Sequence, residues 1–176
     1  LFARGLGDIF DPALRASIGE LIDDVRVRGD AAVCDALARF DGIDLEPGEL
    51  RVGDDDIDAA EVDDDVDRAI DMAIAHLRAF NEQQMANARD WSFDVEPGLT
   101  VGEKLTPISS AGLFTPSGKA SYPSVAYQLA VPATVAGVPQ LALVVPPIPG
   151  GTGDVDAAVL VVCRKLGMRA VFRVNG

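Results

Sequence analysis

Apolar residues recur at helical spacing near the start of the chain. Between residues 11 and 40 this pattern predicts two helices in succession. Asp11 can cap the first helix with Pro12 at its first position, and Gly29 can end it. Asp30 then stands where a cap for the second helix is expected. We therefore expect two consecutive helices that meet near Gly29.

The strongest helical pattern covers roughly residues 64 to 88. Its apolar positions form one stripe, made of Val66, Ile70, Ala73, Ile74, Leu77 and Phe80. His76, the single histidine of the chain, lies off this stripe and is predicted to be a surface residue rather than a metal ligand or a base. We expect residues 1 to 92 to form a helical N-terminal region.

From Trp91 onward, short apolar runs alternate with glycine and proline. This change predicts strands, with a hairpin around Pro97 and Gly98. Within the next predicted helix we expect a kink or a restart at Pro132, because proline has no amide hydrogen to donate. Beyond the hairpin, helix and strand patterns alternate over residues 121–137 (helix), 139–147 (strand), 153–167 (helix) and 169–174 (strand).

This alternation predicts the α/β fold class. We expect the helical N-terminal region to be followed by a strand hairpin and by the first part of an open, Rossmann-like sheet in residues 93 to 176. Ligands of such sheets bind at the carboxyl ends of the strands. Because the chain begins with Leu1 and ends directly after a predicted strand, we also expect it to be a piece of a longer protein.

Charge is distributed unevenly along the chain. The net charge of the whole chain is −13; residues 1 to 100 contain 25 acidic and 9 basic side chains, and residues 101 to 176 contain 3 and 6. An acidic field repels phosphate backbones and anionic lipids, so we expect no nucleic-acid partner and no membrane partner. Two isolated cysteines and the lack of a long apolar segment favour a soluble, cytoplasmic protein.

The most acidic run, residues 54 to 67, is predicted to be a solvated helical face with its caps. An EF-hand loop that began at Asp54 would need glycine and glutamate where Ala59 and Asp65 stand, so that calcium motif is excluded. Cys34 and Cys163 lie far apart in apolar helical patterns, which predicts buried thiols and no disulfide.

The loop GLFTPSGKAS, residues 112 to 121, superficially resembles a phosphate-binding loop. A P-loop needs four residues between its first glycine and its Gly-Lys pair, and then serine or threonine. Here five residues separate Gly112 from Gly118, and Ala120 follows Lys119. The sequence therefore excludes a P-loop. The run PGGTGD, residues 149 to 154, also fails the dinucleotide fingerprint and is predicted to be a surface turn.

Several blocks of the chain together resemble the histidinol dehydrogenase family. The loop and the helix after it, AGLFTPSGKASYPSVAYQLAVPATVAGV, resemble that family's GLY-x-PGG loop, YPSSVLM-like helix and AGV turn. The other matching blocks, VRVRGDAAVCDALARFDG, IAHLRAFNEQQ, VPQLALVVPP and LGMRAVFRVNG, occur in the family's order. The resemblance covers nearly the whole chain, which we expect to be the N-terminal part of such an enzyme.

The resemblance implies a function. Enzymes of this family oxidise L-histidinol to L-histidine in two NAD-dependent steps of histidine biosynthesis, and they work as homodimers with one zinc ion per site. The zinc ion positions the substrate, and a Glu-His pair transfers protons. These parts are expected beyond residue 176, so the resemblance implies no catalytic residue and no metal ligand in this segment, which we expect to be inactive by itself.

The resemblance also implies a cofactor contact in the loop. The family's tyrosine that contacts NAD corresponds to Phe114, and Pro116 and Gly118 are the other residues implied to bind the cofactor. Phenylalanine retains the ring but lacks the hydroxyl. Ser117 replaces a family glycine, and Asn175 interrupts the usual V-G-G end.

These departures leave two alternatives open. The first is an NAD-dependent dehydrogenase of the same family that acts on another small alcohol, such as sulfopropanediol. The second is a non-catalytic α/β interaction module, because these 176 residues contain no complete catalytic set.

Overall fold

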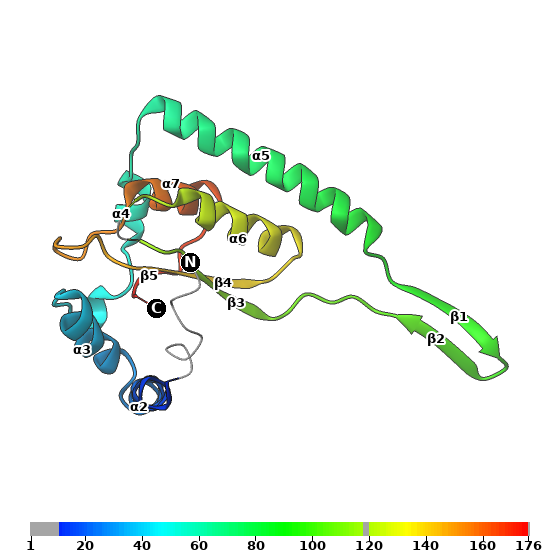
Figure 1. Ribbon diagram of the computed structural model, residues 1–176. Coiled ribbons are helices and arrows are strands. Elements are labelled where there is room, and N and C mark those ends of the chain that lie inside the picture. The colour runs from blue at the N-terminus through cyan, green and yellow to red at the C-terminus, as the bar shows by residue number, and fades with distance from the viewer. Residues whose placement is uncertain (1–10, 118–119, 176) are drawn as a thin grey trace. The chain divides into compact units, whose positions relative to one another are not determined.

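The computed structural model describes residues 11–117 and 120–175. The chain divides into two compact units, residues 1–50 and residues 51–176, and each is described by itself (Figure 1). The predicted division into a helical region, residues 1–92, and an α/β domain, residues 93–176, stays a prediction. The predicted fold class is confirmed: helices come first, followed by an antiparallel hairpin and a parallel sheet.

The first unit consists of α2 (Pro12–Arg28), α3 (Asp30–Asp41) and the short 3-10 helix η1 (Pro47–Glu49). The Asp11 side chain caps α2 as predicted, because it accepts a hydrogen bond from the amide of Ala13 at 2.9 Å. The predicted cap for α3 is wrong. Gly29, with φ of 60°, occupies the cap position, and Asp30 is already the first helical residue. The chain passes from one helix to the next through this one glycine.

The second unit is built on a parallel sheet with the strand order β3-β4-β5. The strands are β3 (Ser110–Phe114), β4 (Gln140–Val145) and β5 (Val171–Arg173), and the helices between them are α6 (Pro123–Val135) and α7 (Ala157–Lys165). Figure 1 shows both helices on the same face of the sheet. The helix α6 continues through Pro132, so the chain does not restart there.

Strand alternation decides which side chains enter the core. Leu113, Leu143, Val145 and Val171 are buried in one cluster with residues of α6 and α7. The neighbouring positions along each strand point to the opposite face. On that face Phe114 is 43% exposed, and Val144 and Phe172 are half-buried. One face of this sheet is therefore packed, and the other still presents apolar side chains to solvent.

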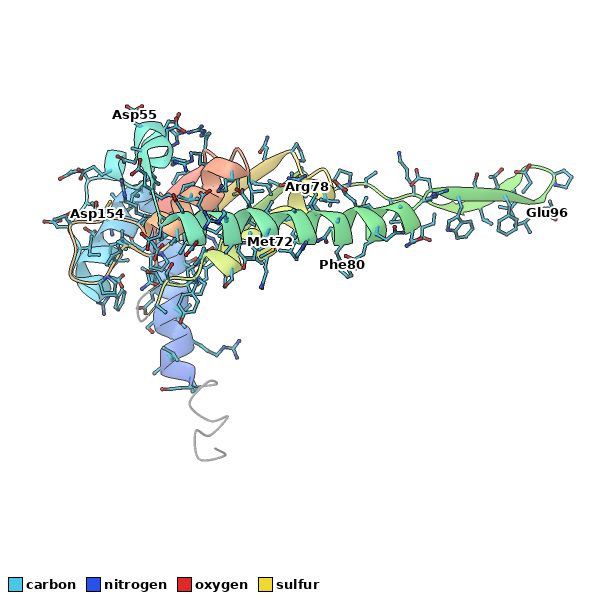
Figure 2. The ribbon with its side chains drawn as sticks, turned by 90° about the horizontal axis from the view of Figure 1, so that it is seen from above. Asp55, Met72, Arg78, Phe80, Glu96 and Asp154 are labelled. Atoms are coloured by element: carbon cyan, nitrogen blue, oxygen red, sulfur yellow. The ribbon has the colours of Figure 1, made fainter. Side chains whose placement is uncertain are left out.

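Two further helices precede the sheet: α4 (Asp54–Ala59) and α5 (Asp64–Asn87). The helix α5 packs on α6 and α7 and buries Ile70. Part of the predicted stripe is wrong, because Phe80 is 62% exposed and Val66 is 40% exposed. Figure 2 shows Phe80 on the stretch of α5 that leads toward the hairpin. The apolar periodicity extends along the whole of α5, but the elements that pack against the helix cover only part of its length.

The predicted hairpin is confirmed. Strands β1 (Trp91–Glu96) and β2 (Leu99–Glu103) are antiparallel and join through Pro97 and Gly98. Gly98 has φ of 88°, a conformation that favours glycine. Every residue of both strands is exposed.

Most carboxylates of the acidic run are exposed as predicted, but several also pair with cations distant in sequence. Asp56 pairs with Arg173 of β5 at 3.2 Å, and Asp58 pairs with Arg169 at 2.8 Å. Lys165 of α7 lies 2.9 Å from Asp67 and 2.8 Å from Asp71, both on α5. The run therefore attaches α4 and α5 to the end of α7 and to β5. The sequence pattern alone did not predict this role.

Candidate functional site

The candidate site lies at the carboxyl end of the sheet, where β3 leads into α6. Phe114 is the last residue of β3 and pairs in register with Val144, which pairs in turn with Phe172 of β5. These three side chains form a row on the face of the sheet that α6 and α7 do not cover. The carboxyl edge of an open parallel sheet is the usual position for a bound ligand.

Phe114, the first of the three residues predicted to bind the cofactor, lies at this edge. The Phe114 ring is 43% exposed and is therefore available for stacking. Pro116, two residues further along the chain, is exposed, and Ser117 is half-buried. Gly118 lies outside the described residues. The structure thus brings Phe114 and Pro116 to one loop, and their contact with a cofactor stays a prediction.

The two helices that follow strands of the sheet differ at their N-termini. Asp156 caps α7, and its carboxylate accepts hydrogen bonds from the amides of Ala158 and Val159 at 2.8 and 3.4 Å. The helix α6 begins after Tyr122 and has no side-chain cap. Free amides at a helix N-terminus attract phosphate groups. The start of α6, directly after the candidate loop, therefore lacks the carboxylate that caps α7.

Thr115 lies between Phe114 and Pro116 in the sequence and is fully buried. The sequence analysis did not identify it as a candidate. Its amide donates to the carbonyl oxygen of Val144 at 2.9 Å. Its hydroxyl oxygen has no hydrogen-bond partner in the part of the chain that the structure describes. A buried, unsatisfied hydroxyl costs about 1–3 kcal/mol. The only signal in the sequence is a threonine directly after an apolar strand, where valine would fit the same space.

The run PGGTGD forms the predicted surface turn after β4. The amide of Ile148 donates to the carbonyl oxygen of Asp154 at 2.8 Å, which closes the loop. Gly150 and Gly153 have φ of 73° and 104°, conformations that permit this tight path. The loop is held by its own hydrogen bonds.

The titratable side chains of the described residues form no metal-binding cluster. Within residues 11–117 and 120–175, no three His, Cys, Asp or Glu side chains come close enough to hold a metal ion. His76 is exposed on α5, as predicted. Cys34 and Cys163 are buried as predicted, and burial raises the pKa of Cys163 to about 12. Its thiol therefore stays protonated and unreactive near neutral pH.

Residues 9–176 match the sequence profile of the family described as histidinol dehydrogenase. The chain belongs to the histidinol dehydrogenase family.

Individual relatives agree with this assignment. The chain is 39% identical to a histidinol dehydrogenase of Rhizobium meliloti (strain 1021) over 165 residues, which are 93% of this chain and 37% of the relative. It is 39% identical to "Histidinol dehydrogenase homolog 2" of Mesorhizobium japonicum over 158 residues, which are 89% of this chain and 35% of that relative. The fold also matches the crystal structure of histidinol dehydrogenase from Elizabethkingia anophelis. That match has a TM-score of 0.84 and 25% identity, and it covers 93% of this chain and 37% of the other.

The chain thus spans little more than a third of the length of these histidinol dehydrogenase relatives. None of the helices in the described part of the chain is long and apolar enough to cross a membrane. The segment contributes a sheet edge and a loop to the family's architecture. The functional proposal below therefore concerns the full-length protein and not this segment alone.

Proposed function

We propose that the full-length protein containing this chain is an NAD- and zinc-dependent histidinol dehydrogenase. It oxidises L-histidinol to L-histidine in two hydride-transfer steps of histidine biosynthesis. The observation that carries this proposal is the identity of 39% to a histidinol dehydrogenase across 93% of the chain.

In this proposal the segment supplies one wall of the NAD site. The exposed Phe114 ring packs against a flat ring of the cofactor, and Pro116 and Gly118 are the other residues that we propose to bind it. The uncapped start of α6 faces the negative charge of the pyrophosphate. The position of this loop at the carboxyl edge of the sheet supports the assignment.

The described residues do not fit a zinc ion, because no ligand set comes together among them. We propose that residues beyond residue 176 supply the zinc ligands and the acid-base pair. A zinc ion held by those residues would supply an electrophilic centre for the substrate. The segment itself orients the cofactor and excludes water from one side of it.

The test measures NADH formation by the purified full-length protein with L-histidinol. We expect turnover that is lost on treatment with a chelator and restored by added zinc. The isolated segment, residues 1–176, is expected to be inactive. Turnover of a different alcohol together with none of L-histidinol would overturn the substrate assignment but would leave the NAD-dependent chemistry intact.

A different substrate has support from two observations. Relatives named only as histidinol dehydrogenase homologs match this chain at 36–39% identity, which is as high as several relatives that carry the name without that qualification. Phe114 also lacks the hydroxyl of the family's tyrosine. The alternative is an NAD-dependent dehydrogenase for another small alcohol. A panel of short-chain diols and amino alcohols, measured beside L-histidinol, separates the two.

We further propose that the protein is a cytoplasmic homodimer with no nucleic-acid or membrane partner. The acidic net charge of −13 supports the absence of polyanionic partners. Sedimentation analysis of the full-length protein tests the dimer, and cell fractionation tests the location.

A further inference from the structure

Thr115 places an unpaired hydroxyl group directly after the last residue of β3. The side chain is 0% exposed, and its hydroxyl oxygen has no hydrogen-bond partner within residues 11–117 and 120–175. Most buried polar side-chain atoms of native proteins are hydrogen-bonded, so an exception calls for a physical reason. A hydroxyl group that is buried without a partner destabilises the folded protein, and a function is one reason to retain it.

The strand pairing fixes the direction of this side chain. The amide of Thr115 donates to the carbonyl oxygen of Val144 on β4, so the strand geometry continues to this residue. Side chains two positions apart in a strand lie on the same face, and Leu113 is buried in one cluster with residues of α6 and α7. The Thr115 hydroxyl group therefore points to the side of the sheet on which both helices lie (Figure 1).

The start of α6 lies on that side, at the same end of the sheet. The helix connects the carboxyl end of β3 to the amino end of the parallel strand β4, and it packs against β3. Its first turn is therefore at the carboxyl edge, where Thr115 is. The helix begins at Pro123, and no side chain caps its first amides. The unpaired hydroxyl group and the uncapped N-terminus thus meet at one corner of the sheet, which we call the β3-α6 corner.

The next corner, between β4 and α7, is built differently. The residue after β4 is Pro146, which is buried and has no polar side chain. Asp156 caps α7, and its carboxylate accepts hydrogen bonds from the amides of Ala158 and Val159. A carboxylate of the chain itself therefore occupies the position that an anion would take there. The β3-α6 corner offers donors and no such carboxylate.

The charge around the β3-α6 corner also favours an anion. Residues 104–153, which include β3, α6 and β4, contain no Asp or Glu, although the net charge of the chain is −13. Amides at a helix N-terminus attract phosphate groups, and a hydrogen bond from a hydroxyl group to an ionised acceptor is stronger than one to a neutral acceptor. The chemical class that fits the corner is a phosphate or pyrophosphate group.

We propose that Thr115 is a cofactor-binding residue whose hydroxyl group donates a hydrogen bond to the pyrophosphate of NAD, directly or through one water molecule that the phosphate holds. This inference rests on the proposed NAD site and adds to it a residue outside the three implied by the family resemblance. The hydroxyl oxygen is covered in the free protein, so its partner arrives only with a local adjustment of the backbone around it. The destabilisation caused by the unpaired group is then relieved on binding and contributes to affinity.

The first test uses Thr115→Val in the full-length protein, because valine has nearly the same shape and lacks the hydroxyl group. Calorimetry is expected to show NAD bound about tenfold more weakly, while chemical denaturation without NAD shows a more stable protein. A merely structural role would not change the two quantities in opposite senses. Thr115→Ser keeps the hydroxyl group and is expected to retain most of the affinity.

The matched control is Thr134→Val, the same substitution near the other end of α6. Its hydroxyl group donates to the carbonyl oxygen of Ala130 at 2.8 Å, within the helix. Thr134→Val is expected to lower stability and to leave NAD affinity unchanged. Steady-state kinetics add a second readout: Thr115→Val should raise the KM for NAD about tenfold and leave kcat at saturating NAD nearly unchanged.

The choice of ligand tests which part of the cofactor the hydroxyl group reaches. ADP-ribose retains the pyrophosphate without the nicotinamide, and adenosine lacks the pyrophosphate. Thr115→Val is expected to weaken the binding of NAD and of ADP-ribose by the same factor and to leave the inhibition constant of adenosine unchanged. An equal loss for adenosine would contradict a contact with the phosphates.

The outcomes separate this inference from the proposed function. If the unmodified protein does not bind NAD, the proposed function fails, and the role of Thr115 fails with it. If the unmodified protein binds NAD and a folded Thr115→Val protein binds it equally well, only the role of Thr115 is overturned. A Thr115→Val protein that does not fold, or that is less stable without NAD, would mean that the hydroxyl group already has a partner, which also overturns the inference.

Discussion

The amide of Thr115 donates a hydrogen bond to the carbonyl oxygen of Val144 at 2.9 Å, and this bond belongs to the last parallel pair of β3 and β4, Phe114 with Val144. The same residue buries a hydroxyl without a hydrogen-bond partner among the described residues. Among the described residues, the amide of Thr115 thus has a hydrogen-bond partner and its hydroxyl has none. Both facts concern the loop that we propose to bind NAD.

Replacing this hydroxyl with a methyl group tests whether it is truly unsatisfied. Thr115→Val is expected to raise the free energy of unfolding by about 1 kcal/mol, because it removes an unpaired buried polar group at nearly constant volume. Chemical denaturation measures the change. The matched control is Thr134→Val, where the hydroxyl donates to the carbonyl oxygen of Ala130 at 2.8 Å and its loss is expected to destabilise. Destabilisation by Thr115→Val would show that the hydroxyl has a partner in the full-length protein.

Restoring the family's tyrosine at the cofactor loop tests the proposed NAD contact. Phe114→Tyr adds a hydroxyl worth about 0.5–1.5 kcal/mol if it forms a hydrogen bond with the cofactor. NAD is then expected to bind up to about tenfold more tightly, as measured by calorimetry on the full-length protein. The control Phe40→Tyr changes a ring in the first unit that is 62% exposed, and it should leave NAD affinity unchanged. Unchanged affinity in Phe114→Tyr as well would place this ring outside the cofactor site.

The hairpin is expected to reject any side chain at Gly102. A Cβ atom there would lie 2.2 Å from the carbonyl oxygen of Trp91, a backbone atom that cannot move without breaking the strand pair. Gly102→Ala should therefore distort the hairpin and lower the melting temperature. Gly19→Ala is the control: it lies inside α2 with nothing within 4 Å, and it is expected to stabilise by about 0.5–1 kcal/mol. Equal melting temperatures for the two variants would contradict the close approach.

The link between α7 and α5 is expected to depend on Lys165. Burial lowers the pKa of this side chain, but hydrogen bonds to Asp71 and Asp67 outweigh burial and raise the pKa above its usual value. A raised folded-state pKa means that the stabilisation is fully present below about pH 10.5, the ordinary lysine value, and is lost as pH rises through the folded value. Lys165→Met should reduce the free energy of unfolding by about 1 kcal/mol at neutral pH, and the difference from the unmodified protein should shrink in strong base.

The control for Lys165→Met is a salt bridge that is expected to contribute little to the free energy of unfolding. Arg68 pairs with Asp65 three residues away on α5, and their side chains are 69% and 91% exposed. Solvent screens such a pair, so Arg68→Met should leave stability nearly unchanged. A loss equal to that of Lys165→Met would mean that the link to α7 has no special weight.

Local pattern predicted most of the elements of this protein. The limits of α5, the hairpin turn at Gly98, and β4 and β5 all followed from periodicity and from turn residues, because these signals act between neighbours in sequence. The order of the sequence blocks also predicted the family, which the comparisons confirm. The errors lie at single positions such as Asp30, where the geometry of one glycine decided which residue caps the helix.

The sequence by itself therefore determined the fold class and the family, and it pointed to the loop at Phe114. Tertiary structure alone decided which surfaces meet. It paired Asp56 with Arg173, left Phe80 in solvent although it continues the apolar stripe of α5, and enclosed the Thr115 hydroxyl with no partner among the described residues. Periodicity predicts which side chains share one face of a helix or strand. Whether that face is buried or paired depends on residues that are distant in sequence.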